Sequence, residues 1–168
     1  MRYYPAALAL TLFCAVSASV GNGAVTAPSP RALALQEQGR AALAAGQVQS
    51  AIDAFESALA VDPAYTALYL DLAHAARRDG MQGKAIHYYR LVLTRDPNNY
   101  AAISGEGEAL AEKGALEKAR RNLAQLKSLC GDGCTETRAL SDKLTATPAV
   151  PVLTAEAATP DATVTVKN

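Results

Sequence analysis

A repeat of 34 residues in the middle of the chain constrains its fold more than any other feature. Two positions of the repeat hold the same residue in every copy: Gly46, Gly80 and Gly114; Ala51, Ala85 and Ala119. Two positions always hold a large apolar residue, and one always holds a small residue: Phe55, Tyr89 and Leu123; Leu35, Tyr69 and Ile103; Gly39, Ala73 and Gly107. Asp62-Pro63 and Asp96-Pro97 have the same spacing, with Cys130-Gly131 at the third place. Six columns in one register indicate three copies of one structural unit.

Each unit is predicted to contain two helices. In the first unit, Ile52, Phe55 and Leu59 recur at the spacing of one apolar helix face. Gly46 can end the helix before this one, because glycine adopts positive φ without steric cost. Pro63 ends the second helix, because proline disfavours helical geometry at the residue before it. One unit cannot bury its apolar stripe alone, so neighbouring units are expected to stack.

This pattern resembles the tetratricopeptide repeat, whose units carry a small residue at the eighth position, Ala at the twentieth, a large apolar residue at the twenty-fourth and Pro at the thirty-second. The matching residues, unit by unit, are Gly39, Ala51, Phe55 and Pro63; Ala73, Ala85, Tyr89 and Pro97; Gly107, Ala119, Leu123 and Gly131. The resemblance covers residues 32 to about 131. It implies an all-α fold, a right-handed solenoid of helical hairpins with about three units. We place the units at 32–65, 66–99 and 100–133, with a C-terminal capping helix at 134–145.

The two ends of the chain are expected to lie outside this fold. Residues 1–24 are typical of a secretory signal peptide, with Arg2 before a short apolar run. Residues 25–31 are interpreted as a linker, and 146–168, rich in Thr, Ala and Pro, as a disordered tail. We therefore expect an exported protein of the bacterial periplasm, with no stable membrane insertion after cleavage. Secretion, or anchoring by an uncleaved N-terminal segment, is the alternative.

Cys130 and Cys134 are the two cysteines that remain after signal cleavage, and two glycines lie between them. An even cysteine count in an exported protein favours a disulfide, here worth about 2 kcal/mol on the chain-entropy model. A redox pair usually shows C-x-x-C beside a strand, and a zinc site needs four ligands. We favour the structural disulfide over a redox pair or half of a metal site.

No catalytic motif is present in the sequence. It lacks G-x-S-x-G, H-E-x-x-H and a phosphate-binding loop. His74 and His87 are predicted on different helix faces, so they should not share a metal. We expect no enzyme activity, no catalytic residue, no metal and no cofactor.

The charge balance argues against nucleic acid as a partner. Lys and Arg number 16, Asp and Glu number 16, and the formal net charge is zero. A basic set lies on the second helix of the third unit, and it is interpreted as solvated surface: Lys118, Arg120, Arg121 and Lys127.

The resemblance also implies a concave groove lined by the first helix of each unit. The residues assigned to it are Gln36, Arg40, Leu70, Asp71, His74, Arg77, Arg78, Glu108 and Glu112. They form a basic centre and an acidic flank, which would suit a peptide with one acidic and one basic end. The alternative is that these charges only keep the array soluble. Members of the family that bind chaperones clamp a terminal carboxylate with Lys and Asn at set places. This clamp is not reproduced here, because the matching places hold Gln36, Arg40, Asp71, Ala101 and Gly105.

These observations predict an exported interaction scaffold that binds a peptide segment or a partner protein in its groove. Two alternatives remain open. One is a thiol-handling protein that uses Cys130 and Cys134, and the other is a module that associates with itself through its terminal apolar faces.

Overall fold

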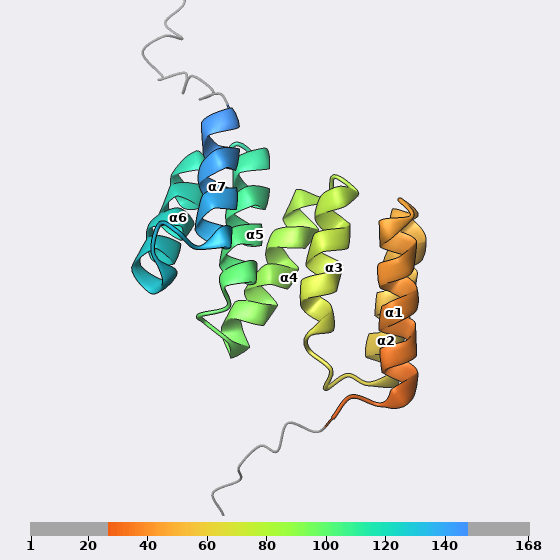
Figure 1. The fold of residues 1–168 in the computed structure, drawn as a ribbon. Helices are drawn as coiled ribbons and strands as arrows, with labels where there is room; N and C mark the ends of the chain where they lie inside the picture. The colour runs from red at the N-terminus through yellow and green to blue at the C-terminus, as the bar shows by residue number, and fades with distance from the viewer. Residues whose placement is uncertain (1–26, 148–168) are drawn as a thin grey trace, which may run out of the picture.

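A computed structural model describes residues 27–147, and over this range the chain forms seven α-helices and no strand (Figure 1). In chain order the helices are α1 (Pro30–Ala44), α2 (Val48–Val61), α3 (Leu68–Arg78), α4 (Gln82–Arg95), α5 (Tyr100–Glu112), α6 (Leu116–Cys130) and α7 (Thr135–Ala146). The prediction of an all-α repeat of helical hairpins is confirmed. The predicted signal peptide, 1–24, and all but the first two residues of the predicted tail lie outside the described residues.

The first helix begins earlier than the sequence suggested. Pro30 and Arg31, assigned to the linker, are its first two residues. The Ser29 side chain accepts a hydrogen bond from the backbone N–H of Ala32, and Pro30 stands at the start of the helix, where its missing N–H costs nothing. Capping and proline together therefore fix this helix start.

Each hairpin turns at a glycine with positive φ. Gly46, Gly80 and Gly114 have φ of 77°, 75° and 81°, each two residues after the end of a first helix. This is the left-handed region, in which other residues are strained. The 34-residue glycine column is therefore the column of hairpin turns.

Small residues let the helices approach closely enough to bury one aromatic ring in each of the first two units. Phe55 and Tyr89 are both 0% exposed. A Cβ added at Gly39 would collide with the Phe55 ring, and one added at Gly105 would collide with the Tyr89 ring. The Tyr89 ring of the second unit therefore packs against the third unit and holds the two units together.

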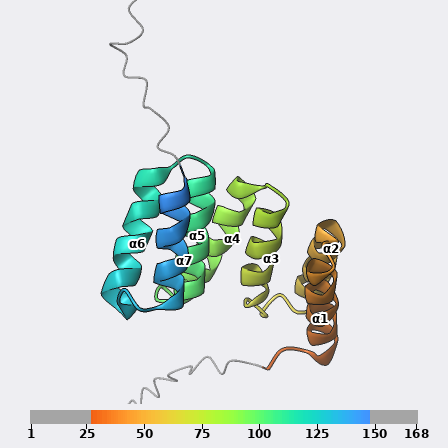
Figure 2. The same ribbon diagram turned by 45° about the horizontal axis from the view of Figure 1, so that its top comes forward.

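The last helix closes the apolar core. Leu140 of α7 is fully buried and packs with Ile103 of α5 and Leu126 of α6. Figure 2 shows α7 alongside these two helices. A Cβ added at Gly107 would collide with Leu140, so a small residue again permits the contact.

The first helices of successive hairpins lie nearer one another than the second helices do. α1 contacts α3, α3 contacts α5, and α5 contacts α7. In the described chain, the backbones of α2 and α4, and those of α4 and α6, stay more than 8 Å apart between Cα atoms. An array that is closer on one side curves toward that side. The concave inner face is therefore formed by α1, α3, α5 and α7.

Candidate functional site

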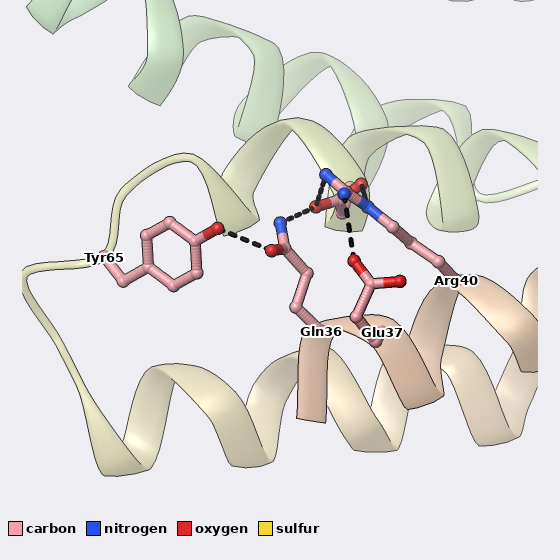
Figure 3. A network of polar contacts seen from close by, with 5 residues as sticks. Gln36, Glu37, Arg40 and Tyr65 are labelled. Atoms are coloured by element: carbon pink, nitrogen blue, oxygen red, sulfur yellow. Dashed lines mark hydrogen bonds and ion pairs between the residues drawn. The ribbon is translucent and has the colours of Figure 1, made fainter. Parts of the chain in front are cut away.

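The N-terminal part of the inner face is held by one carboxylate. Asp71 of α3 accepts a hydrogen bond from Gln36 Nε2 at 2.6 Å and two from Arg40, from Nε and Nη2, each at 3.1 Å (Figure 3). The Tyr65 hydroxyl donates to Gln36 Oε1 at 2.5 Å, and Glu37 lies 3.5 Å from Arg40. Gln36 is only 3% exposed, so its amide depends on these partners for both its donor and its acceptor. Asp71 is also the main reason that the pKa of Arg40 is raised.

The C-terminal part of the inner face is held by a second set of ion pairs. Arg77 of α3 lies 2.5 Å from Glu108 and 3.8 Å from Glu112, both on α5. Glu112 in turn lies 2.8 Å from Lys143 Nζ on α7. Arg78 donates to the backbone carbonyl of Leu43 at 3.0 Å. Every pair of neighbouring first helices is thus bridged by at least one charged contact.

These contacts, which we call the inner-face network, change how the predicted groove can work. The network consists of Gln36, Arg40, Asp71, Arg77, Glu108, Glu112 and Lys143. The basic centre and the acidic flank are joined to each other rather than left open to a ligand. Leu70, also assigned to the groove, is half-buried and packs against the apolar core. A peptide that used these charges would first have to break the pairs among them.

One pocket opens on the inner face between α3, α5 and α7. Its volume is about 180 Å³, and its lining residues are His74, Ala101, Ser104, Gly105, Glu108, Thr135, Glu136 and Ala139. The Ser104 hydroxyl lies 3.1 Å from the backbone carbonyl of Glu136 and 3.2 Å from Glu108 Oε1, which ties the wall made by α5 to the wall made by α7. This pocket leaves room for a ligand group on the inner face.

His74 lies at the wall of this pocket, as a groove residue should. Its Nδ1 is 3.2 Å from the hydroxyl of Tyr89, and its ring meets the Tyr89 ring edge-on. Burial, and secondly the charge of Arg77, lower the pKa of His74. Burial also raises the pKa of Tyr89 to about 12. Both groups are therefore neutral at pH 7, and the pair is a polar wall rather than a charged one.

The contribution of α7 to the pocket was not predicted from the sequence. Thr135, Glu136 and Ala139 belong to a helix predicted only as a cap. The signal was present in the register, because Thr137 follows Ile103 by 34 residues and is 2% exposed, as a core position should be. This helix therefore stands where the first helix of a fourth unit would stand, and it lines the inner face accordingly.

The segment between α6 and α7 brings the two cysteines together. The Cα atoms of Cys130 and Cys134 are 5.8 Å apart, and their sulfur atoms lie within bonding distance. The predicted disulfide fits this geometry and stays a prediction. Cys134 is the residue just before α7, so a bond here would hold the helix start that carries Thr135 and Glu136.

A larger pocket lies away from the inner face. It measures about 430 Å³ and is lined by Gly83, Ile86, Arg90, Leu110, Lys113, Gly114, Ala115 and Lys118, from α4, the end of α5 and the start of α6. Arg90 donates to the largely buried carboxylate of Glu106 at 2.7 Å, and Asn122 donates to the other oxygen of Glu106 at 3.1 Å. The positive charge of Arg90 at this pocket is therefore paired within the fold.

None of the helices within residues 27–147 is both long and apolar enough to cross a membrane. In the same range, no group of three or more His, Cys, Asp and Glu side chains is placed to hold a metal ion. His87 is exposed on α4, whereas His74 is half-buried on α3 at the pocket wall.

Comparisons with known proteins agree with this architecture. Residues 66–99 match the family model described as tetratricopeptide repeat. No curated protein matches the chain in sequence. Among solved structures, the tetratricopeptide repeat domain of Sgt2 from Aspergillus fumigatus superposes with a TM-score of 0.63 at 27% identity, over 70% of this chain and 79% of that one.

Two other domains show the same fold at lower identity. The domain of Arabidopsis OM64 has a TM-score of 0.62 at 17% identity, over 68% of this chain and 94% of that one. The second domain of human RPAP3, solved in complex with the HSP70 peptide SGPTIEEVD, has a TM-score of 0.62 at 19% identity, over 71% of this chain and 98% of that one. Residues 66–99 therefore carry a tetratricopeptide repeat, and the helical hairpins of residues 27–147 have the fold of tetratricopeptide repeat domains.

Proposed function

We propose that this protein is an interaction scaffold that binds a peptide segment or a partner protein on its inner face. The observation that carries the proposal is the pocket between α3, α5 and α7, which is concave, about 180 Å³ in volume and open to solvent on the curved side of the array. The human RPAP3 domain, which shares the fold, was solved with a bound peptide. A groove of this kind suits an extended or helical segment.

The inner-face network supports a binding surface that exists before the ligand arrives. Asp71, Arg77 and Glu112 connect neighbouring first helices through contacts between 2.5 and 3.8 Å. Helices held in this way lose little freedom on binding, so less interaction energy is lost to ordering. Binding by docking onto a rigid surface is therefore the proposed mechanism.

The proposed ligand differs from the acidic peptide of the RPAP3 complex. Gln36 and Arg40 stand at two places of the family's carboxylate clamp, and both already donate to Asp71 at a third. The remaining two places hold Ala101 and Gly105, which line the pocket and have no side-chain donor. An incoming carboxylate at this place would have to compete with Asp71 for the same donors. We therefore place the ligand at the pocket, nearer the C-terminal end of the groove.

Export to the periplasm is part of the proposal and rests on residues 1–24 alone. The apolar run after Arg2 has the length of a signal peptide core. A disulfide between Cys130 and Cys134 would suit such an oxidising compartment. Fractionation of source cells, with the mass of the mature chain, tests this part separately.

Selection from a random peptide library tests the binding function. We would compare the wild-type protein with Ala139→Trp, which fills the pocket from an exposed position, and with Ala124→Trp, an equally exposed alanine on α6 outside the pocket. Peptides enriched on the wild type should bind Ala124→Trp equally and Ala139→Trp at least about tenfold more weakly. No enrichment, or equal binding to all three proteins, would contradict the proposal.

A further inference from the structure

The floor of the inner-face pocket is made of residues without long side chains. Ala101 and Ala139 offer only methyl groups, and Gly105 has no side chain. Gly105 cannot be enlarged, because a Cβ there would collide with the buried Tyr89 ring. The packing of α4 against α5 therefore keeps position 105 without a side chain.

The size of the pocket suits one side chain rather than a whole small molecule. Sites for drug-sized ligands occupy roughly 300–1,000 Å³, whereas this pocket holds about 180 Å³. An apolar cavity of about 150 Å³ is enough for a benzene ring. A leucine, methionine or phenylalanine side chain would fill the space between Ala101, Gly105 and Ala139.

The rim of the pocket is acidic. Glu108 and Glu136 line it, and no lysine or arginine does. The charge of Glu108 is offset by Arg77 at 2.5 Å. Glu136 has no ion-pair partner within 4.0 Å among residues 27–147, and it stands in the first turn of α7. His74 on the opposite wall is neutral at pH 7, so the rim keeps the negative charge of Glu136.

From this arrangement we infer that the pocket selects a segment that presents a large apolar side chain beside a lysine or arginine. The apolar side chain enters between Ala101 and Ala139, and the basic residue pairs with Glu136 at the rim. An acidic neighbour would instead be repelled by Glu136. This inference rests on the proposed function and names the chemistry of its partner.

A charge-reversal experiment on the same random library tests the inference. The proteins are the wild type, Glu136→Lys, and Glu117→Lys as the matched control. Glu136 and Glu117 are each the second residue of their helix, but only Glu136 lines the pocket. Circular dichroism of each variant checks that its helices are retained.

The wild type and Glu117→Lys should enrich peptides with Lys or Arg within two residues of Leu, Met or Phe. Replacing that basic residue by Glu in the peptide should weaken binding to the wild type by about three- to tenfold, as expected for an ion pair at a partly exposed rim. Glu136→Lys should prefer the Glu-containing version. Because the peptide is changed and the protein is not, the first comparison holds even if Glu136→Lys folds poorly.

Two failures can be told apart. Peptides that lose binding to Ala139→Trp but show no basic preference, or an acidic one, would overturn this inference and leave the proposed function standing. Peptides that bind Ala139→Trp as well as the wild type would overturn both.

Discussion

Arg40 on α1 donates two hydrogen bonds to Asp71 on α3, one to each carboxylate oxygen and each 3.1 Å long. Gln36 donates to the same carboxylate from one turn earlier on α1. Asp71 thus accepts three hydrogen bonds from the neighbouring hairpin, in a region where α1 and α3 otherwise touch little. This carboxylate joins the first hairpin to the second on the inner face, together with Arg78, which donates to the Leu43 carbonyl.

Replacing Asp71 by Ala should destabilise the protein by about 1–3 kcal/mol, because the buried Gln36 amide loses its acceptor. Arg40→Ala should cost less than about 1 kcal/mol, because the Arg40 side chain is half exposed. Urea unfolding measures both changes. Asp53→Ala is the control, since this exposed aspartate bonds only within α2 and should change stability by less than about 0.5 kcal/mol. Equal midpoints for Asp71→Ala and Asp53→Ala would contradict the role given to Asp71.

Gly39→Ala should destabilise the first hairpin, because the added methyl group would collide with the fully buried Phe55 ring. Overpacking of this kind costs about 1–3 kcal/mol. Gly83→Ala is the matched control, because the only atom near an added Cβ is Lys113 Nζ at 3.9 Å. That change should be neutral or stabilising, since alanine favours a helix. Thermal unfolding of both variants provides the measurement, and a lower midpoint for Gly83→Ala than for Gly39→Ala would refute the packing argument.

The titration of Tyr89 should lower the free energy of unfolding as the pH rises from 10 to 12. Burial raises its pKa from 10.0 to about 12, so the folded chain keeps a proton that the unfolded chain releases. The stability present below pH 10 is therefore lost through this window, by about 2–3 kcal/mol. Urea midpoints from pH 9 to 12 should fall less steeply for Tyr89→Phe than for the wild type. Tyr100→Phe, at an exposed tyrosine, should follow the wild type. A Tyr89→Phe profile parallel to that of the wild type would contradict the assignment.

Purified from an oxidising compartment, the protein should contain no free thiol at Cys130 or Cys134. Replacing both by Ser should cost about 2 kcal/mol, because a five-residue loop is no longer closed in the unfolded chain. It should also weaken peptide binding, since α7 supplies Thr135, Glu136 and Ala139 to the pocket. Thiol titration in denaturant without reductant provides the count. Two titratable groups would show that the disulfide is absent. Unchanged binding by the double variant would show that the position of α7 at the pocket does not depend on the disulfide.

The periodic part of the fold could be read from the sequence because it depends on residue type at fixed spacing. Glycine at 46, 80 and 114 marks turns, and Ala51, Ala85 and Ala119 mark close helix contacts, all of which repeat. The inner-face network could not be predicted in this way. Whether Arg77 meets Glu108 or a ligand depends on the angle between α3 and α5, which spacing alone does not determine.

The capping helix shows a different limit. Its apolar residues indicated that α7 would cover the end of the core, and Leu140 does so. The pocket, however, depends on Ala139 and Glu136, which lie on the edge of that helix toward the inner face. The position of Thr137 in the 34-residue register pointed to a fourth first helix, and its polar side chain hid the signal.

Amide chemical shifts would show directly whether the protein binds its partner at the inner-face pocket. A peptide enriched on the wild type would be titrated into ¹⁵N-labelled protein. The largest shift changes should fall on Ala101, Gly105 and Ala139, with small changes along α2 and α4. Changes centred instead on Lys113 and Lys118, at the larger pocket between α4 and α6, would contradict binding at the inner-face pocket.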